Sequence, residues 1–326
     1  MEQILFKYKD SLESIRKIEV TTIFEDYSED CLYTIAIPTF KRVDDLLMTL
    51  NSAINQKTDI PYNIIVVDNN PERNDETEVM MKEHYHQNLS YYKNSENIGM
   101  AGNWNRLFLL CKTKYMIMLH DDDCLYSCFV ESMHKLISKD DTISVINGGK
   151  QKWNGSNVSM NVEVPSKFRN VTMKKGTLFF NFYFGPPSGC LFNVADVLEI
   201  GGVDPESYPS IDYVLIQKLI LAGKKLQINR NELMLYRIVG NTTSKIETQI
   251  KWVQLDEQIK DELGEILKLP NAYIKFIKYM VLKFRILCIN KIQPDFKYKN
   301  FNNGGNLTII LFKSFQFLYK LYYNLL

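Results

Sequence analysis

The chain has 326 residues, of which 45% are hydrophobic and 24% are charged, and its formal net charge is +1. This composition is typical of a globular protein with room for one large core or two modest ones. The small net charge gives no sign of a nucleic-acid partner, and we expect none. Residues 1–31 lack the continuous apolar run of a signal peptide, and charged residues interrupt the most hydrophobic segment, so we expect no membrane span.

Short β-rich runs alternate with helical patterns in the first half of the chain. The sequence predicts strands at residues 33–37, 62–68, 89–93 and 115–119. It predicts helices in the segments that follow them, at residues 43–56, 75–84, 100–111 and 125–137. A βαβα series is typical of a mostly parallel sheet with helices on both faces, so the predicted fold class is α/β.

Polar residues follow every predicted strand. They lie at residues 38–42, at Asp68, around Asn97 and at residues 120–123. Because ligands bind at the carboxyl ends of the strands in such sheets, we expect these residues to form one site.

Three consecutive carboxylates, Asp121, Asp122 and Asp123, follow the fourth predicted strand directly. Like charges this close raise one another's proton affinity unless a cation compensates them. Carboxylate oxygens suit Mg²⁺ or Mn²⁺, and substrate phosphates and water complete the shell of such ions. The three residues therefore predict either a metal site for a diphosphate substrate or a solvated acidic turn at a helix start.

The second half of the chain is less regular and ends in a helical region. Residues 142–241 contain several turn signals, and we interpret them as an elaboration of the same domain. The predicted divisions are an N-terminal extension at 1–30, a main domain at 31–244 with halves 31–125 and 126–244, and an extension at 245–326. Within the extension, helices are expected at 245–263, 272–289 and 307–325.

The C-terminal segment is basic and rich in aromatic residues. From Pro270 onward it has nine basic residues against one acidic residue, whereas the rest has 30 basic and 37 acidic residues. A basic residue near an anionic leaflet contributes about 1 kcal/mol to membrane binding. Two interpretations stay open, namely docking of residues 272–326 on a membrane surface, or packing on the body or in a homo-oligomer interface.

Cysteine usage bears on the compartment. The six cysteines form no CxxC pair and no regular framework, as expected of reduced thiols in a cytosolic protein. We therefore expect a cytoplasmic protein, at the inner face of the cell membrane if the tail docks there.

Several segments together resemble the family 2 glycosyltransferases with a GT-A fold. In the first half these segments are IAIPTFKR at 35–42, IVVD at 65–68, NIG at 97–99 and LHDDD at 119–123. In the second half they are SGCLF at 188–192, IGGVD at 200–204, DY at 212–213, LYRI at 235–238 and NTTS at 241–244. The resemblance covers about residues 33–244, and the combination is specific although no single segment is.

The resemblance implies an inverting transfer of a sugar from a nucleotide-diphosphate donor, with a UDP-sugar favoured. The acceptor would be a hydroxyl of a glycan or of a lipid-linked molecule, as in bacterial capsule or surface polysaccharide synthesis. Asp121 and Asp123 would bind Mn²⁺ or Mg²⁺, which would neutralise charge on the departing diphosphate. The residues expected around the nucleotide are Pro38, Thr39, Phe40, Arg42, Asp68, Asn97, Asp121 and Asp122.

By the same resemblance, Asp212 would be the catalytic base, near the start of a helix predicted at 211–221. An aspartate at a helix start is otherwise explained by the helix dipole alone. The loop for acceptor and diphosphate would contain Gly189, Arg237, Thr243 and Ser244.

Two residues depart from the family pattern. Val239 stands where many relatives have a histidine that helps to hold metal or diphosphate, and His120 stands where many have another acid.

Three other functions are alternatives to sugar transfer. A sugar nucleotidyltransferase would need a glycine-rich phosphate loop after the first strand, and residues 38–42 contain no glycine. A dinucleotide-dependent oxidoreductase would need a GxGxxG motif after that strand, and this motif is also missing. A non-catalytic glycan-binding or scaffolding module is the remaining alternative, and the intact carboxylates argue against it.

Overall fold

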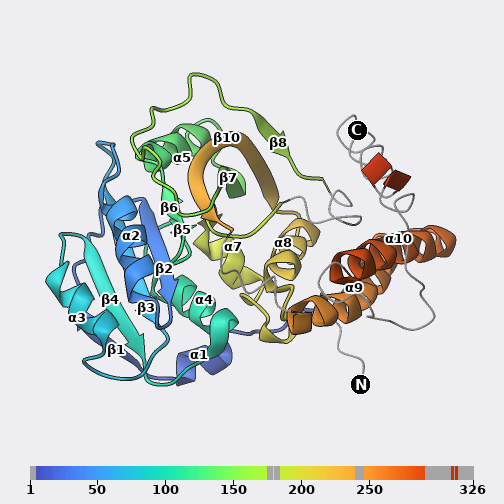
Figure 1. Ribbon diagram of the computed structural model, residues 1–326, viewed down its shortest axis with the longest axis horizontal. Helices are drawn as coiled ribbons and strands as arrows, with labels where there is room; N and C mark the ends of the chain where they lie inside the picture. Colours follow the sequence, from blue (N-terminus) through green and yellow to red (C-terminus); the bar gives the residue numbers. More distant parts are fainter. Residues whose placement is uncertain are drawn as a thin grey trace.

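The computed structural model describes residues 5–174, 179, 184–238, 246–290, 310–311 and 313–314. The first strands and their helices lie at one end of the molecule, and the long helices of the C-terminal region lie at the other (Figure 1).

The strands of these residues form one ten-stranded sheet in the order β1-β4-β3-β2-β5-β9-β7-β10-β6, with β8 paired to β10 off this path. They are β1 (Val20–Phe24), β2 (Tyr33–Thr39), β3 (Tyr62–Asp68), β4 (Leu89–Asn94), β5 (Tyr115–Met118), β6 (Cys124–Leu125), β7 (Ile143–Trp153), β8 (Asn170–Thr172), β9 (Cys190–Asn193) and β10 (Lys225–Arg237).

The helices flank this sheet and extend beyond it. They are α1 (Glu13–Lys17), α2 (Val43–Ile54), α3 (Glu76–Glu83), α4 (Gly99–Leu110), α5 (Phe129–Ile137), α7 (Val194–Glu199), α8 (Ile211–Leu221), α9 (Ile246–Ile266), α10 (Asn271–Asn290) and the short 3-10 helix η1 (Pro205–Ser207).

The predicted α/β class is confirmed, with a parallel block in the first half of the sheet. Strands β4, β3, β2 and β5 are parallel neighbours, whereas β9 runs antiparallel to both β5 and β7. All residues of β2 are buried, because helices cover both faces of the sheet at this position. This explains the continuous apolar run in its sequence.

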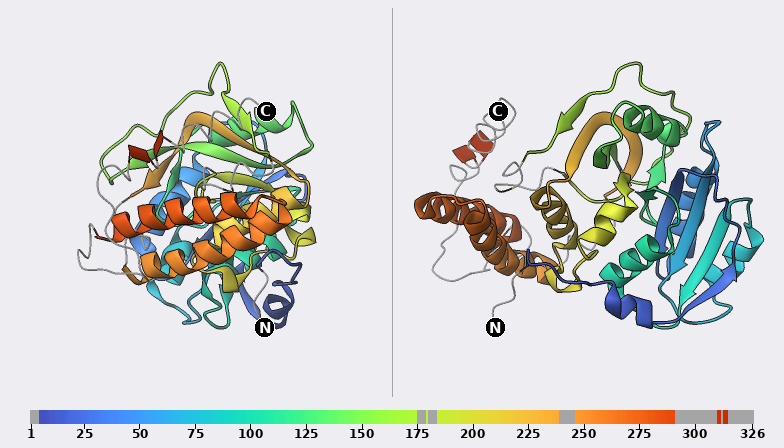
Figure 2. Two further views of the ribbon diagram at one scale, coloured as in Figure 1. Left: turned by 90° about the vertical axis from the view of Figure 1, so that its right-hand side faces the viewer. Right: turned by 180° about the vertical axis from the view of Figure 1, so that it is seen from behind.

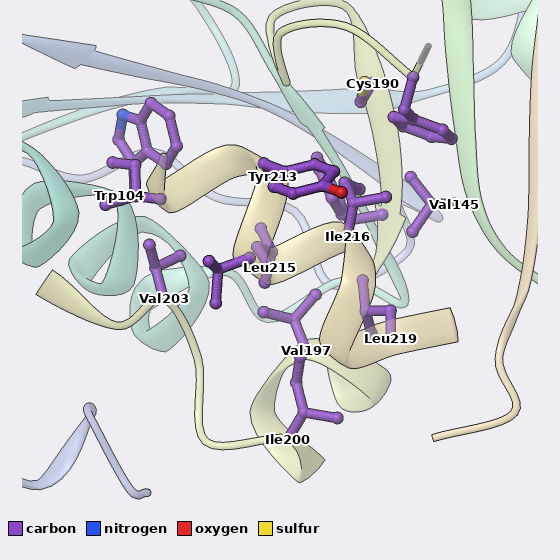
Figure 3. Close-up of a cluster of buried hydrophobic side chains, with 14 of the residues drawn as sticks. Trp104, Val145, Cys190, Val197, Ile200, Val203, Tyr213, Leu215, Ile216 and Leu219 are labelled. Carbon is purple, nitrogen blue, oxygen red and sulfur yellow. The ribbon is translucent and has the colours of Figure 1, made fainter. Parts of the chain in front are cut away.

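The core has two main clusters, one on each face of the sheet. One contains residues of α2, α3 and α5, and the other contains residues of α4, α7 and α8. Figure 3 shows the second cluster, where Trp104 of α4, Val197 of α7 and Ile216 of α8 pack in one group. Residues 213–220 of α8 are all buried, so this helix is held on every side and its first turn is fixed.

The segment before residue 31 takes part in the sheet. Strand β1 pairs antiparallel with β4, and the backbone N–H of Ser11 donates to the carbonyl of Gly201 at 2.9 Å. The boundary predicted at residue 30 stays a prediction, but the extension is not separate from the main sheet.

Helices α9 and α10 lie side by side at the far end of the molecule (Figure 2). They correspond to the helices expected at 245–263 and 272–289, while the helix expected at 307–325 falls almost entirely outside the described residues. The Lys260 ammonium of α9 is buried and donates to the Tyr213 hydroxyl of α8 at 3.1 Å. Among the helices that the structure describes, none is both long and apolar enough to span a membrane.

Candidate active site

Asp123 is anchored between β6, α2 and β10. Its side chain is fully buried, and its Oδ1 accepts a hydrogen bond from the backbone N–H of Arg237 at 2.8 Å. The hydroxyl of Thr49 donates to its carbonyl oxygen at 2.8 Å. The antiparallel pairing of β6 with β10 brings these residues together from opposite halves of the chain.

Asp121 and Asp122 are held by the loop that follows β2. The Thr39 hydroxyl donates to Asp121 Oδ2 at 2.9 Å, and Arg42 Nη1 lies 3.4 Å from Asp121 Oδ1 and 2.7 Å from Asp122 Oδ2. Burial raises the pKa of Asp121 to about 6, although the nearby Arg42 charge opposes this shift. Thr39 and Arg42, which the sequence predicts around the nucleotide, therefore donate hydrogen bonds to these carboxylates.

A second group of side chains forms around Asp123. His120, Asp122 and Asp123 each offer one ligand atom, and these atoms lie within 4.8 Å of one another. The His120 Nε2 and Asp123 Oδ2 atoms are buried and have no hydrogen-bond partner in the structure. Asp121 is not a member of this group, which differs from the pair expected from the sequence.

The protonation of these groups suits a metal. Burial raises the pKa of the Asp123 carboxyl to about 7 and lowers the pKa of His120 to about 4. His120 is thus a neutral imidazole with a free ring nitrogen, stacked on Trp104 with 5.4 Å between ring centroids. An orphaned imidazole nitrogen beside two carboxylates is a donor set that a divalent cation would satisfy. The residues present fit the metal that the family pattern implies.

Asp68 is covered rather than open to a ligand. Its Oδ2 accepts from Tyr91 Oη at 2.8 Å and from Lys93 Nζ at 2.7 Å, while its Oδ1 accepts from the backbone N–H of Asn70 at 2.9 Å. The carboxylate is fully buried, and burial raises its pKa despite the Lys93 charge. Its expected contact with a nucleotide stays a prediction.

The other residues expected around the nucleotide lie at the same edge of the sheet. Pro38 is buried within β2, whereas the Phe40 side chain is exposed just beyond that strand. The Asn97 Oδ1 accepts from Asn69 Nδ2 at 2.7 Å and from the backbone N–H of Gly99 at 2.9 Å, which fixes the start of α4. Phe40 and the exposed Asn97 are therefore the accessible members of the set.

Asp212 lies in the first turn of α8, as the sequence predicts. Its Oδ1 accepts from the backbone N–H of Tyr213 at 2.8 Å. Burial raises the pKa of this carboxyl to about 6, so desolvation outweighs the backbone hydrogen bonds that would lower it. Burial raises the pKa of Cys190, the first residue of β9, and the nearby charge of Asp212 adds to this shift.

Gly189 and Arg237 occupy constrained positions close to these groups. Gly189 has a φ of +70°, and a Cβ atom there would lie 2.0 Å from Met234 Sδ. Glycine avoids both the steric clash and the backbone strain because it has no Cβ. The Arg237 guanidinium pairs with Asp45 at 2.9 Å and lies over the Trp153 ring at 5.1 Å. Thr243, Ser244 and Val239 lie outside the described residues.

A protein-family model described as glycosyl transferase family 2 matches residues 34–200, slightly more than half of the chain. The chain belongs to glycosyl transferase family 2. The family resemblance found in the sequence is thereby confirmed. No curated protein matches this glycosyltransferase sequence.

Solved structures share the fold of this family 2 glycosyltransferase at low sequence identity. The structure of residues 1–349 of S. aureus TarS in complex with UDP-GlcNAc has a TM-score of 0.59 and 14% identity, over 81% of this chain and 76% of that one. The mannosyltransferase PcManGT of Pyrobaculum calidifontis, in complex with GDP-Man and Mn²⁺, has a TM-score of 0.54 and 13% identity, over 95% of this chain and 88% of that one. These similarities confirm the expected GT-A fold.

Two residues of this glycosyltransferase were not assigned to the site from its sequence. In the sequence His120 stands out as a departure from the family pattern, and its position next to the three aspartates is the signal that could identify it as a ligand. Lys150 lies on β7, where no motif marks it. Burial lowers the pKa of its ammonium group, which donates to Asn147 Oδ1 and, at 3.4 Å, to the carbonyl of Gly148.

Proposed function

We propose that this family 2 glycosyltransferase transfers a sugar from a nucleotide-diphosphate donor, with a UDP-sugar favoured, to a hydroxyl of a glycan or lipid-linked acceptor. The transfer inverts the configuration at the anomeric carbon of the sugar. It serves the assembly of a bacterial surface polysaccharide. The observation that carries this proposal is the group of His120, Asp122 and Asp123, whose two orphaned buried atoms lie on the edge of the sheet where ligands bind.

The metal ligands in this proposal are Asp123, Asp122 and His120. They would hold Mn²⁺ or Mg²⁺, which supplies charge neutralisation for the diphosphate leaving group. The Mn²⁺ in the structure of the mannosyltransferase supports this assignment. Asp121, which the sequence predicts as a metal ligand, lies outside this group, and its carboxylate accepts hydrogen bonds from Thr39 and Arg42.

The donor contacts in this proposal follow the edge of β2 and β3. Phe40 offers an exposed ring to the nucleobase, and Asn97 offers an exposed amide nearby. TarS is complexed with UDP-GlcNAc and the mannosyltransferase with GDP-Man, which supports a nucleotide-sugar donor without distinguishing the base. The family resemblance of the sequence favours UDP.

The diphosphate contacts include a cation that the sequence did not suggest. Burial lowers the pKa of the half-buried Lys150, and the charge of Asp123 opposes this shift, so a bound anion would stabilise its ammonium group. We assign Lys150 to the diphosphate, in the role left open by Val239, together with Arg237, Thr243, Ser244 and the tight turn at Gly189.

The acceptor proton goes to Asp212. With its pKa raised to about 6, this carboxylate is ionised near neutral pH, yet it is a stronger base than an ordinary aspartate. A base with a pKa close to the working pH is effective in proton transfer.

Membrane contact is a separate proposal. Residues 272–326 carry eight more positive than negative charges, so we propose that they bring the enzyme to an anionic inner membrane surface. Co-sedimentation of the full chain with anionic vesicles tests this, using a variant with Lys297, Lys299, Lys313 and Lys320 changed to Glu. Undiminished sedimentation of the variant contradicts docking and favours the homo-oligomer interpretation, which analytical ultracentrifugation then tests.

Release of nucleoside diphosphate from UDP-, GDP- and TDP-sugars tests the proposed turnover. The parent is expected to release one diphosphate in the presence of Mn²⁺, and the Asp123→Asn variant is expected to lose this activity. The matched control is Asp59→Asn, an exposed aspartate in the loop before β3, which keeps full activity. Donor binding without any release, in every acceptor mixture tried, supports the non-catalytic glycan-binding alternative.

A further inference from the structure

A large groove runs along α2 and reaches the short strand β6. Its volume is about 700 Å³, which lies within the range of small-molecule sites in proteins. The residues that line the groove include Met48 and Asn51 of α2 and Asn55 just after it, which lie three and four residues apart and so share one face of the helix. A helix of 12 residues is about 18 Å long, so the groove suits an extended ligand.

The opposite wall of the groove is the segment 156–161, which hydrogen bonds hold in place. The backbone N–H of Ser127 donates to the carbonyl of Met160 at 2.9 Å, and the Ser127 hydroxyl accepts from the backbone N–H of Val162 at 3.1 Å. The indole N–H of Trp153 donates to the carbonyl of Ser156 at 2.6 Å. The wall is thus tied both to β6 and to the end of β7.

The groove is joined to the candidate active site by covalent and polar contacts. Cys124, in its lining, directly follows Asp123. Trp153, also in its lining, lies under the Arg237 guanidinium, and the backbone N–H of Arg237 donates to Asp123. One end of the groove therefore lies a single residue from the carboxylate group.

The chemistry of the lining is mixed rather than purely apolar. Met48, Leu125 and Met160 supply apolar surface, while Asn51 of α2 and Asn157 of the facing segment, both exposed, line the groove from opposite walls. No hydrogen bond is recorded for these two amides in the part of the chain that the structure describes. A sugar ring has apolar C–H faces and a rim of hydroxyls, so such a lining matches it, whereas a lipid chain would displace water from the exposed amides without replacing its hydrogen bonds.

We propose that this groove binds the acceptor glycan, holding sugar units beyond the one that reacts. This inference rests on the proposed function and deepens it, because it assigns the acceptor a carbohydrate portion of several units. The amides of Asn51 and Asn157 donate to and accept from the hydroxyls, and the methionines pack against the ring faces.

Methyl NMR of the full chain, labelled at the methionine methyl groups, tests the groove directly. The probes are maltotetraose, chitotetraose and mannotetraose at millimolar concentration, with a dodecyl polyoxyethylene detergent below its micelle concentration as the lipid-like probe. At least one tetrasaccharide is expected to shift the signals of Met48 and Met160 and to leave that of the buried Met81 of α3 in place.

Two variants and a control make the result specific. Asn51→Leu and Asn157→Leu each weaken the affinity for that tetrasaccharide about 3- to 10-fold, the effect of one lost hydrogen bond. Gln87→Leu removes an exposed amide between α3 and β4 and leaves the affinity at the parent value. Unchanged positions of the core methyl signals show that each variant is folded.

Three outcomes overturn the proposal: no tetrasaccharide shifts the two groove signals, only the detergent shifts them, or both asparagine variants bind as the parent does. Calorimetric titration with nucleotide-sugars separates this failure from that of the proposed function. Donor binding without glycan shifts removes the groove alone, whereas glycan shifts without donor binding remove the transferase.

Discussion

Lys93 of β4 forms a buried ion-pair network with Asp68 and Asp75 next to the candidate active site. Its side chain is 1% exposed, and its Nζ lies 2.7 Å from Asp68 Oδ2 and 2.9 Å from Asp75 Oδ1. Lys93→Met removes this cation and leaves the fully buried Asp68 carboxylate without a partner of opposite charge. Breaking a buried pair from one side costs about 3 to 5 kcal/mol, so the free energy of unfolding is expected to fall by that amount near neutral pH.

The loss in this variant depends on pH in a defined direction. Burial already raises the pKa of Asp68 above its ordinary value, and removal of Lys93 raises it further. A carboxyl whose folded pKa is raised favours the folded state at low pH and disfavours it as the pH rises through that pKa. The deficit of Lys93→Met is therefore largest near neutral pH and shrinks in acid.

Urea unfolding followed by circular dichroism measures this effect. The double variant Lys93→Met/Asp68→Asn is expected to regain at least half of the lost stability, because it removes the unpaired charge. Lys112→Met is the control, since Lys112 lies 2.8 Å from Glu25 in an exposed pair and its loss costs about 1 kcal/mol or less. If Lys93→Met lowers the free energy of unfolding by less than about 1 kcal/mol near neutral pH, the buried Lys93–Asp68 pair does not stabilise the fold in this way.

Three further predictions concern the site itself. Asp212→Asn lowers the transfer rate about 100- to 10,000-fold. The rate of the parent enzyme rises with pH through about 6, because the ionised carboxylate is the active form. A flat pH–rate profile across that range contradicts the role of Asp212 as base. Gly189→Ala lowers the free energy of unfolding by about 1 to 3 kcal/mol through the contact with Met234, measured against Gly155→Ala, where a Cβ meets nothing within 4 Å; equal losses contradict it. Lys150→Met weakens UDP binding in competition assays about 10-fold without weakening Mn²⁺ binding, and a parallel loss of Mn²⁺ points to structural damage instead.

The first half of the sheet could be predicted from the sequence because its pattern is local. Strands such as β3 are apolar along their length, being buried on both faces, and the helices between them have their own period. Strand β1 was not predicted, since its residues are only partly buried and it joins the sheet through an antiparallel pairing with a strand far along the chain. Non-local pairing of this kind leaves little trace in a single segment.

The sequence predicts that the carboxylates lie together, but not which side chains they contact. Asp121, Asp122 and Asp123 were placed together because they follow a strand, yet in a tight turn consecutive side chains point in different directions. Asp121 therefore faces Arg42, while Asp123 groups with His120. The spatial arrangement that buries Asp68 under Lys93 depends on side-chain direction across two strands, which the residue order does not give.

Metal-dependent binding of a nucleotide-sugar tests whether His120 and Asp123 hold a metal that the donor needs. We would titrate UDP-GlcNAc and GDP-Man calorimetrically into the parent, with Mn²⁺ and with a chelator, and repeat the titration in His120→Ala, Asp123→Asn and the control Asp59→Asn. We expect binding of one donor that requires Mn²⁺, is lost in the first two variants and is kept in the control. Binding that is equally strong with the chelator, or unchanged in both His120→Ala and Asp123→Asn, would contradict it.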